Sequence, residues 1–158
     1  MSPLLRPATT DDVPLILDFI RRLADYEKLA HKVTATEAQL RATLFGAIPA
    51  AHCVLAFAPD SAPAGFAIYF FNYSTFLARP GLYLEDLFVR PEIRGRGFGK
   101  AMLLHLAKLA NARGCGRMEW TVLDWNQPAI EFYESLGARR MNEWQICRLT
   151  GDALARYA

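Results

Sequence analysis

The sequence predicts a single α/β domain spanning residues 1–158, with a mixed central sheet and helices on both faces. Two features of the pattern support this. In the first half, apolar β-favouring runs follow one another through short turns, which is typical of antiparallel neighbours. In the second half, strand and helix patterns alternate, which is typical of a parallel βαβ unit. A chain of 158 residues also has the size of one domain.

The first elements are a strand and two helices. A strand is predicted over residues 2–8, followed by a helix over 13–29 whose apolar side chains keep helical spacing. The residues just before that helix, Thr9 to Asp12, are good N-caps. A second helix is predicted over 36–44, because Gly46 and Pro49 follow it.

Three strands come next, over residues 53–58, 65–73 and 82–89, separated by clusters of turn-forming residues. The rest alternates: a helix to residue 113, a strand over 117–123 and a helix that begins after Asn126. A last strand is predicted over 143–149, and a short or frayed helix over 151–158.

Composition argues against several classes of partner. The net charge of +2 is too small to predict binding to nucleic acid or to an anionic membrane surface. No apolar stretch reaches the roughly 20 residues that a membrane span needs. The first residues lack the pattern of a signal peptide. We therefore expect a cytoplasmic protein that binds neither nucleic acid nor membrane.

Three cysteines, Cys53, Cys115 and Cys147, are an odd number without the spacing of a metal site. Cys53 and Cys147 lie in apolar, strand-like runs and are predicted to be buried thiols, while Cys115 lies in a turn. No metal site is expected. The three histidines have no catalytic motif around them.

The most informative segment joins the strand that ends at Val89 to the helix that follows. Glycines stand at every second position of this loop, at 95, 97 and 99, and allow close approach of a ligand to the backbone. The free N–H groups at the helix start favour an anion. Nearby positive charge comes from Arg94, Arg96 and Lys100. The segment therefore predicts a site for a cofactor with a diphosphate. It fits neither the dinucleotide fingerprint nor the phosphate loop of nucleotide hydrolases.

A second segment has the layout of a capped helix. Asn126 is a plausible N-cap, and Pro128 suits the first turn. Ile130, Tyr133 and their apolar neighbours share one helix face, and Gly137 suits a left-handed C-cap.

Together the two segments resemble the GNAT N-acetyltransferases. Arg94-x-x-Gly97-x-Gly99 is similar to the family's R-x-x-G-x-G, which binds the diphosphate of acetyl-coenzyme A. The second segment is similar to N-x-x-A-x-x-x-Y-x-x-x-G. The resemblance implies the GNAT acyl-CoA N-acyltransferase fold, in which two adjacent strands splay apart around the cofactor.

The resemblance extends to the diamine (spermidine/spermine) acetyltransferase branch, and most closely to its thialysine acetyltransferase subgroup. Residues 6–9, 23–29, 52–53, 65–75 and 83–86 carry the resemblance to the branch, and residues 73–75 and 123–127 carry the resemblance to the subgroup. The polyamine enzymes have an acidic residue and a Trp where this chain has Ser74 and Phe76, which favours a smaller amine. The branch also implies a homodimer.

The resemblance implies a role for each matched position. Tyr133 would hydrogen-bond to the cofactor sulfur and donate a proton, and Glu85 would take the amine's proton through water. The cofactor would contact Leu87, Phe88, Val89, Arg94, Gly95, Arg96, Gly97, Phe98, Gly99, Lys100, Asn126 and Tyr133. The amine would contact Tyr26, Glu27, Glu85, Glu119 and Glu143.

Other interpretations remain for these residues. Tyr133 also fits a core aromatic, and Tyr26 and Glu27 also fit a solvated helix end. Alternation along the strand predicts that Asp86 faces away from Glu85, with a structural hydrogen bond. For the whole chain, the alternatives to a small-amine acetyltransferase are a protein or peptide N-acetyltransferase and a non-catalytic sensor of coenzyme A.

Overall fold

The computed structural model describes residues 3–158 and divides them into two compact units, Met1–Thr121 and Val122–Ala158. The predicted first strand began at Ser2, which lies outside the described residues. It is observed from Leu4 to Pro7.

A five-stranded sheet forms the first unit. Its strands lie in chain order: β1 (Leu4–Pro7), β2 (His52–Phe57), β3 (Pro63–Ser74), β4 (Arg79–Val89) and β5 (Arg117–Trp120). The first four are antiparallel neighbours, whereas β5 runs parallel to β4. The predicted mixed sheet is therefore confirmed.

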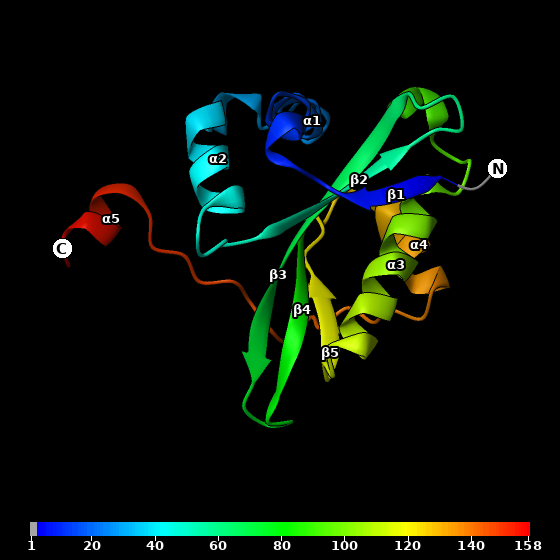
Figure 1. Ribbon diagram of the computed structural model, residues 1–158. Coiled ribbons are helices and arrows are strands. Elements are labelled where there is room, and N and C mark those ends of the chain that lie inside the picture. Colours follow the sequence, from blue (N-terminus) through cyan, green and yellow to red (C-terminus); the bar gives the residue numbers. More distant parts are fainter. Residues whose placement is uncertain (1–2) are drawn as a thin grey trace. The chain divides into compact units, whose positions relative to one another are not determined.

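Helices cover both faces of this sheet (Figure 1). On one face lie α1 (Val13–Tyr26) and α2 (Glu37–Phe45), and on the other lies α3 (Phe98–Ala112). Short 3₁₀ turns occur at Thr10–Asp12, Ala30–Lys32 and Pro91–Ile93. The parallel β4–α3–β5 crossover places the glycine-rich loop at the end of β4.

The strand alternation separates two apolar layers. Phe19 of α1 stacks on Phe66 of β3 at 5.6 Å between ring centroids, and lies 5.7 Å from the ring of Phe88 of β4. On the opposite face, α3 packs on β4, and Met102 and Leu106 of α3 are buried, as are Leu82 and Leu84 of β4. Burial on both faces fixes the register of β4, which carries much of the candidate site.

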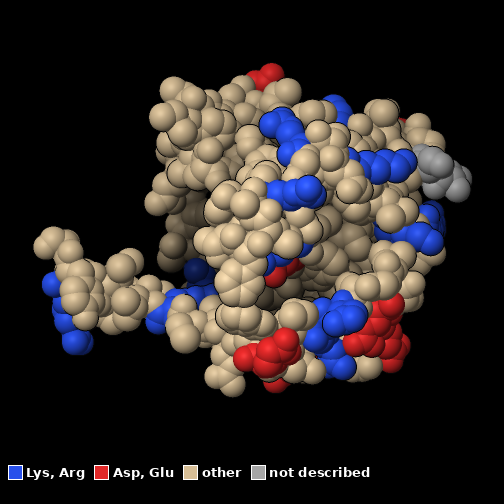
Figure 2. All heavy atoms as spheres, turned by 90° about the horizontal axis from the view of Figure 1, so that it is seen from below, with Lys and Arg blue, Asp and Glu red and all other residues tan. Residues whose placement is uncertain are grey.

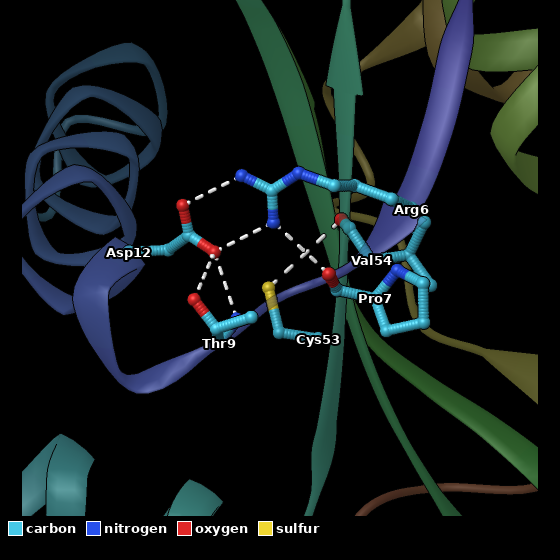
Figure 3. A network of polar contacts seen from close by, with 6 residues as sticks. All are labelled: Arg6, Pro7, Thr9, Asp12, Cys53 and Val54. Carbon is cyan, nitrogen blue, oxygen red and sulfur yellow. Dashed lines mark hydrogen bonds and ion pairs between the residues drawn. The ribbon is translucent and has the colours of Figure 1, made fainter.

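A polar network ties β1 to the start of α1 (Figure 3). The Arg6 guanidinium donates two hydrogen bonds to the Asp12 carboxylate, at 2.7 and 2.8 Å. The backbone N–H of Thr9 donates to the same carboxylate at 2.7 Å. These bonds lower the pKa of Asp12 to about 2, with the Arg6 hydrogen bond as the largest cause. The motif at residues 6–9 therefore has a structural role in this chain.

The second unit contains α4 (Gln127–Ser135) and α5 (Gly151–Ala155). The strand predicted over 143–149 is wrong, because these residues form no regular element. Their apolar side chains alternate, but Trp144 and Ile146 are exposed and β-pairing is absent from the segment. Cys147, predicted to be buried there, is exposed as well, whereas Cys53 is buried as predicted.

Candidate active site

The glycine-rich loop has the conformation that its sequence predicts. Gly95 and Gly97 have positive φ angles of 77° and 85°. A Cβ on either glycine would meet no atom within 4 Å, so the left-handed backbone, not lack of space, requires glycine there. Gly97 is the N-cap of α3, and the first turn of that helix contains no acidic residue. The N–H groups of this turn are therefore suited to bind an anion from outside the chain.

Basic side chains surround the loop, but they do not all point the same way. Arg96 and Lys100 are exposed beside it. Arg94 instead lies against the strand: its Nε–H donates to the Val89 carbonyl at 2.9 Å. Its guanidinium carbon is 4.3 Å from the centroid of the Tyr26 ring.

Beyond Leu84 the edge of β4 next to β5 is open. Pairing with β5 covers only Gly81 to Leu84, although β4 continues to Val89. The backbone N–H of Arg90 donates to the carbonyl of Ala64 at 2.9 Å, so it points toward β3. Because backbone groups alternate in direction along a strand, the N–H and C=O of Phe88, two residues earlier, point toward β3 as well. Those of Leu87 and Val89 point to the open edge. Within residues 3–121, β3 pairs with this part of β4 on one side, and no strand pairs with it on the β5 side.

A β-bulge interrupts β4 immediately before this open edge. Asp86 is paired with Ile68, and Leu84 with the next residue of β3, Tyr69, so Glu85 is the extra residue. The extra residue cancels the alternation of side chains. The prediction that Asp86 faces away from Glu85 assumed an unbroken alternation, which β4 does not have. The charges of Glu85 and of Glu27, at the end of α1, both act on Asp86.

These three residues, Glu27, Glu85 and Asp86, form what we call the acidic cluster. Burial, followed by the charges of Glu85 and Glu27, raises the pKa of Asp86 to about 6. Burial also raises the pKa of Glu27. Among the residues described, no Lys or Arg forms an ion pair with any member of the cluster. The cluster is thus suited to bind a cation.

The backbone turns sharply where α1 meets the cluster. Lys28 N–H donates to Asp25 at 3.1 Å and Leu29 N–H donates to Ala24 at 2.8 Å, which is the Schellman pattern. Lys28 occupies the left-handed position, with φ of 62°. The helix predicted to run to residue 29 therefore ends at Tyr26 and leaves Tyr26 and Glu27 at its terminus.

Glu119 already has a partner. It lies on β5 opposite Tyr83, and the Arg117 Nε is 2.7 Å from its carboxylate. The same arginine donates to the Ser74 hydroxyl at 3.4 Å, and the Leu77 N–H donates to that hydroxyl at 3.3 Å. Ser74 is buried at the end of β3, while Phe76 in the turn to β4 is almost fully exposed.

In the second unit, the capped helix forms as its sequence predicts. The Asn126 side chain accepts from the Ala129 N–H at 3.4 Å at the start of α4. Gly137, with φ of 90°, ends the helix: its N–H donates to Glu134 and the Ala138 N–H donates to Tyr133. Tyr133 is half-buried on this helix. Glu143 is exposed in the irregular segment that follows.

Comparison with known proteins identifies the family. Residues 20–138 match the model of the acetyltransferase (GNAT) family. The chain belongs to the GNAT family of acetyltransferases. It is 41% identical to a thialysine N-epsilon-acetyltransferase of Sus scrofa, over 99% of this chain and 98% of the relative. It is 38% identical to an L-ornithine N5-acetyltransferase of Arabidopsis thaliana, over 95% of this chain and 85% of that one.

The fold comparison agrees with this assignment. An integron cassette protein from the mobile metagenome of V. cholerae superposes with a TM-score of 0.81 at 28% identity, over 99% of this chain and 98% of that chain. The chain is thus a GNAT-family N-acetyltransferase with the GNAT fold, as its motifs predict.

The acidic cluster of this acetyltransferase shows what the sequence reasoning missed. The sequence predicts a site without Asp86, because side chains alternate along a regular strand. That alternation does not hold across a bulge. A usable signal was present, because two consecutive acids interrupt an apolar run between Leu84 and Leu87. The contact of Arg94 with Tyr26 had no such signal, since 68 positions of sequence separate two residues that the fold brings together.

Other surface features add little to the site. Figure 2 shows one face of the molecule, on which basic and acidic side chains form several separate groups. Residues 3–158 contain no group of three or more His, Cys, Asp or Glu side chains arranged to hold a metal ion. In the same part of the chain, no helix is both long and apolar enough to span a membrane.

Proposed function

We propose that this acetyltransferase transfers the acetyl group of acetyl-coenzyme A to a primary amine of a small basic molecule, by direct attack in a ternary complex. The observation that supports this most strongly is the bulge at Glu85. It places an unpaired acidic cluster directly before the open edge of β4, and the anion-binding loop follows that edge. A cationic amine and an anionic cofactor would thus meet at one strand.

On this proposal, backbone groups hold the cofactor. The N–H groups of residues 95–100 would bind its diphosphate, with Arg94, Arg96 and Lys100 adding charge. The amide-containing arm would pair with the open edge at Leu87 and Val89, and an N–H group of this edge would polarise the thioester carbonyl. Phe88 is the least suited of the three predicted strand contacts, because its backbone is directed to β3 and its ring is buried against Phe19. Asn126 and Tyr133 are the further cofactor contacts that the family resemblance implies.

The acidic cluster would bind the amine and prepare it for attack. With a pKa near 10.4, only about one amine in a few thousand is neutral at pH 7, so deprotonation costs roughly 4–5 kcal/mol. The cluster attracts the ammonium form, and Glu85 would accept its proton through water. The leaving thiolate, with a pKa of about 8.5, needs less help, which a hydrogen bond from the Tyr133 hydroxyl would supply.

An acyl-enzyme route has little support in this chain. Burial raises the pKa of the Cys53 thiol to about 12, so it stays protonated near neutral pH and is a poor nucleophile. Direct attack by the amine requires no such residue.

The charges favour a small amine over a long polyamine. A polyamine needs several spaced carboxylates, yet Glu119 is paired with Arg117 and Ser74 is buried at the end of β3. One unpaired cluster fits one ammonium group. The relatives that act on thialysine and ornithine point the same way, and a lysine-like amino acid or a short diamine is the substrate class that we propose.

A panel assay tests this function. Thialysine, lysine, ornithine, short diamines, spermidine and a lysine-containing peptide would each be incubated with acetyl-coenzyme A while thiol release is followed. We expect the basic amino acids or short diamines to have the highest kcat/KM. Peptide acetylation without small-amine turnover would contradict the proposal, and so would coenzyme A binding without any acetylated product.

We also propose, from the branch resemblance, a cytoplasmic homodimer. Light scattering checks the oligomeric state. A mass near 17.7 kDa, that of a single chain, would contradict the dimer.

A further inference from the structure

The position of Arg94 is not the one expected of a residue that serves the phosphates alone. Its guanidinium carbon lies 4.3 Å from the centroid of the Tyr26 ring and 5.8 Å from that of Phe88. Its Nε–H is held by the Val89 carbonyl at 2.9 Å. One planar group therefore contacts the end of α1 and the end of β4 at once.

The two ends that Arg94 joins belong to different halves of the proposed site. Val89 is the last residue of β4, on the open edge assigned to the cofactor. Tyr26 is the last residue of α1 and directly precedes Glu27 of the acidic cluster. The helix stops at this point with Lys28 in a left-handed conformation, so Tyr26 lies at the terminus of the helix and not within it.

We propose that Arg94 is a positioning residue for the amine, because its guanidinium holds the Tyr26 ring and thereby the α1 terminus beside the acidic cluster. This rests on the proposed function, since it assigns the neighbourhood of Tyr26 and Glu27 to the amine. Arg94 has five N–H donors and the Val89 bond uses one, so this role is compatible with a contact to the diphosphate.

Replacing Arg94 by lysine distinguishes binding of the diphosphate from positioning of the Tyr26 ring. Arg94→Lys keeps the positive charge that a diphosphate needs, but it removes the planar face and the Nε–H that hold Tyr26 and Val89 together. A residue that only binds phosphate would mainly change the KM of acetyl-coenzyme A. A positioning residue would change the KM of the amine as well, with little change in kcat.

The test is a double-mutant cycle with Arg94→Lys and Tyr26→Leu, using the best amine of the panel. We expect Arg94→Lys to raise the amine KM about two- to five-fold, the range of a cation–π contact at an exposed site. Tyr26→Leu should raise the amine KM at least as much and leave the KM of acetyl-coenzyme A unchanged. The double variant should match Tyr26→Leu alone, because the second change removes a contact already lost.

Arg113→Lys is the matched control. Arg113 lies 5.6 Å from the ring centroid of Phe71, and its charge is not among the causes of the raised pKa of Asp86 or Glu27, so its replacement should alter neither KM. Thermal melting of each variant checks that it is folded.

Two results would overturn the inference while the proposed function stands. One is an Arg94→Lys variant in which only the KM of acetyl-coenzyme A changes. The other is a double variant whose amine KM is the product of the two single effects. If the wild-type protein acetylates no amine of the panel, the proposed function fails first and this inference with it.

Discussion

Glu85 and Asp86 are consecutive in β4 at a bulge that interrupts the alternation of side chains, and the charge of Glu85 acts on Asp86. Glu27 adds a third negative charge from the end of α1. The fold therefore collects like charges at a place where burial already disfavours them. Such a placement is costly for stability and useful for binding a cation.

The raised pKa of Asp86 predicts a stability that falls as the pH rises. The folded protein holds the Asp86 proton up to about pH 6, whereas the unfolded chain releases it near 3.8. Between these values the folded state binds more protons, so the free energy of unfolding decreases with pH. Asp86→Asn should remove this decrease and stabilise the protein by roughly 3 kcal/mol at pH 7. Urea unfolding from pH 4 to pH 7 measures it, and identical pH profiles for the two proteins would contradict the cluster.

Asp12 predicts the opposite trend in a separate pH window. Its pKa is lowered to about 2 in the folded protein, against 3.8 for the unfolded chain. The stabilisation is therefore complete above about pH 4 and is lost as the pH falls toward 2. Because Arg6 is partly exposed, we expect Asp12→Asn to cost only about 1 kcal/mol at pH 7. Acid unfolding followed by circular dichroism checks this: the variant should lack the pH dependence between 4 and 2 that this carboxylate gives the wild type.

The left-handed glycine of the loop should matter for the cofactor beyond its effect on stability. Gly97→Ala forces a side chain into a conformation that disfavours it, and it adds a Cβ where the diphosphate is proposed to approach. We expect the Kd for coenzyme A to rise about ten-fold or more. Gly114→Ala is the control, since Gly114 also has positive φ with open space around it, but lies at the other end of α3. Equal losses of affinity in both variants, measured by calorimetry, would argue against the loop as the diphosphate site.

Tyr133→Phe tests the proposed proton donor. The variant keeps the ring on α4 and removes only the hydroxyl, so coenzyme A should still bind. Turnover should fall about 100-fold or more, the lower range for the loss of an acid catalyst. Tyr157→Phe, at an exposed position near the C-terminus, is the control. Turnover of Tyr133→Phe close to that of the wild type would remove the hydroxyl from the mechanism.

Lys28 is a site where the wild-type residue costs stability. It occupies the left-handed position of a Schellman turn, which glycine normally fills. We expect Lys28→Gly to be more stable than Lys28→Ala by about 1 kcal/mol. Comparing these two variants by urea unfolding isolates the backbone term, because both lack the lysine side chain. An alanine variant as stable as the glycine variant would contradict the assigned strain.

Local chemistry made part of this protein predictable from sequence. The loop at residues 95–100 and the caps of α4 at Asn126 and Gly137 each depend on residue types that favour one backbone conformation. Such signals are contained in a few adjacent residues. The mixed sheet followed from the order of the strands, and it too is confirmed.

Predictions based on side-chain periodicity were wrong where the backbone is irregular or where a predicted strand has no neighbouring strand to pair with. Residues 143–149 alternate like a strand, but alternation does not supply a neighbour to pair with. Helix α1 stops before its apolar pattern does, because Lys28 adopts a conformation that lysine rarely prefers. Arg94 was expected only at the phosphates because its contact with Tyr26 depends on the tertiary fold.

The open side of β4 beyond Leu84 has a consequence for how the purified protein should behave. Unpaired amides in an extended strand are a template on which another polypeptide can add. If the amide-containing arm of coenzyme A, its pantetheine group, hydrogen-bonds to that edge, it occupies the place of a neighbouring strand and prevents another polypeptide from pairing there. We therefore expect coenzyme A to suppress aggregation during concentration or storage, while an adenine nucleotide that lacks the arm should not.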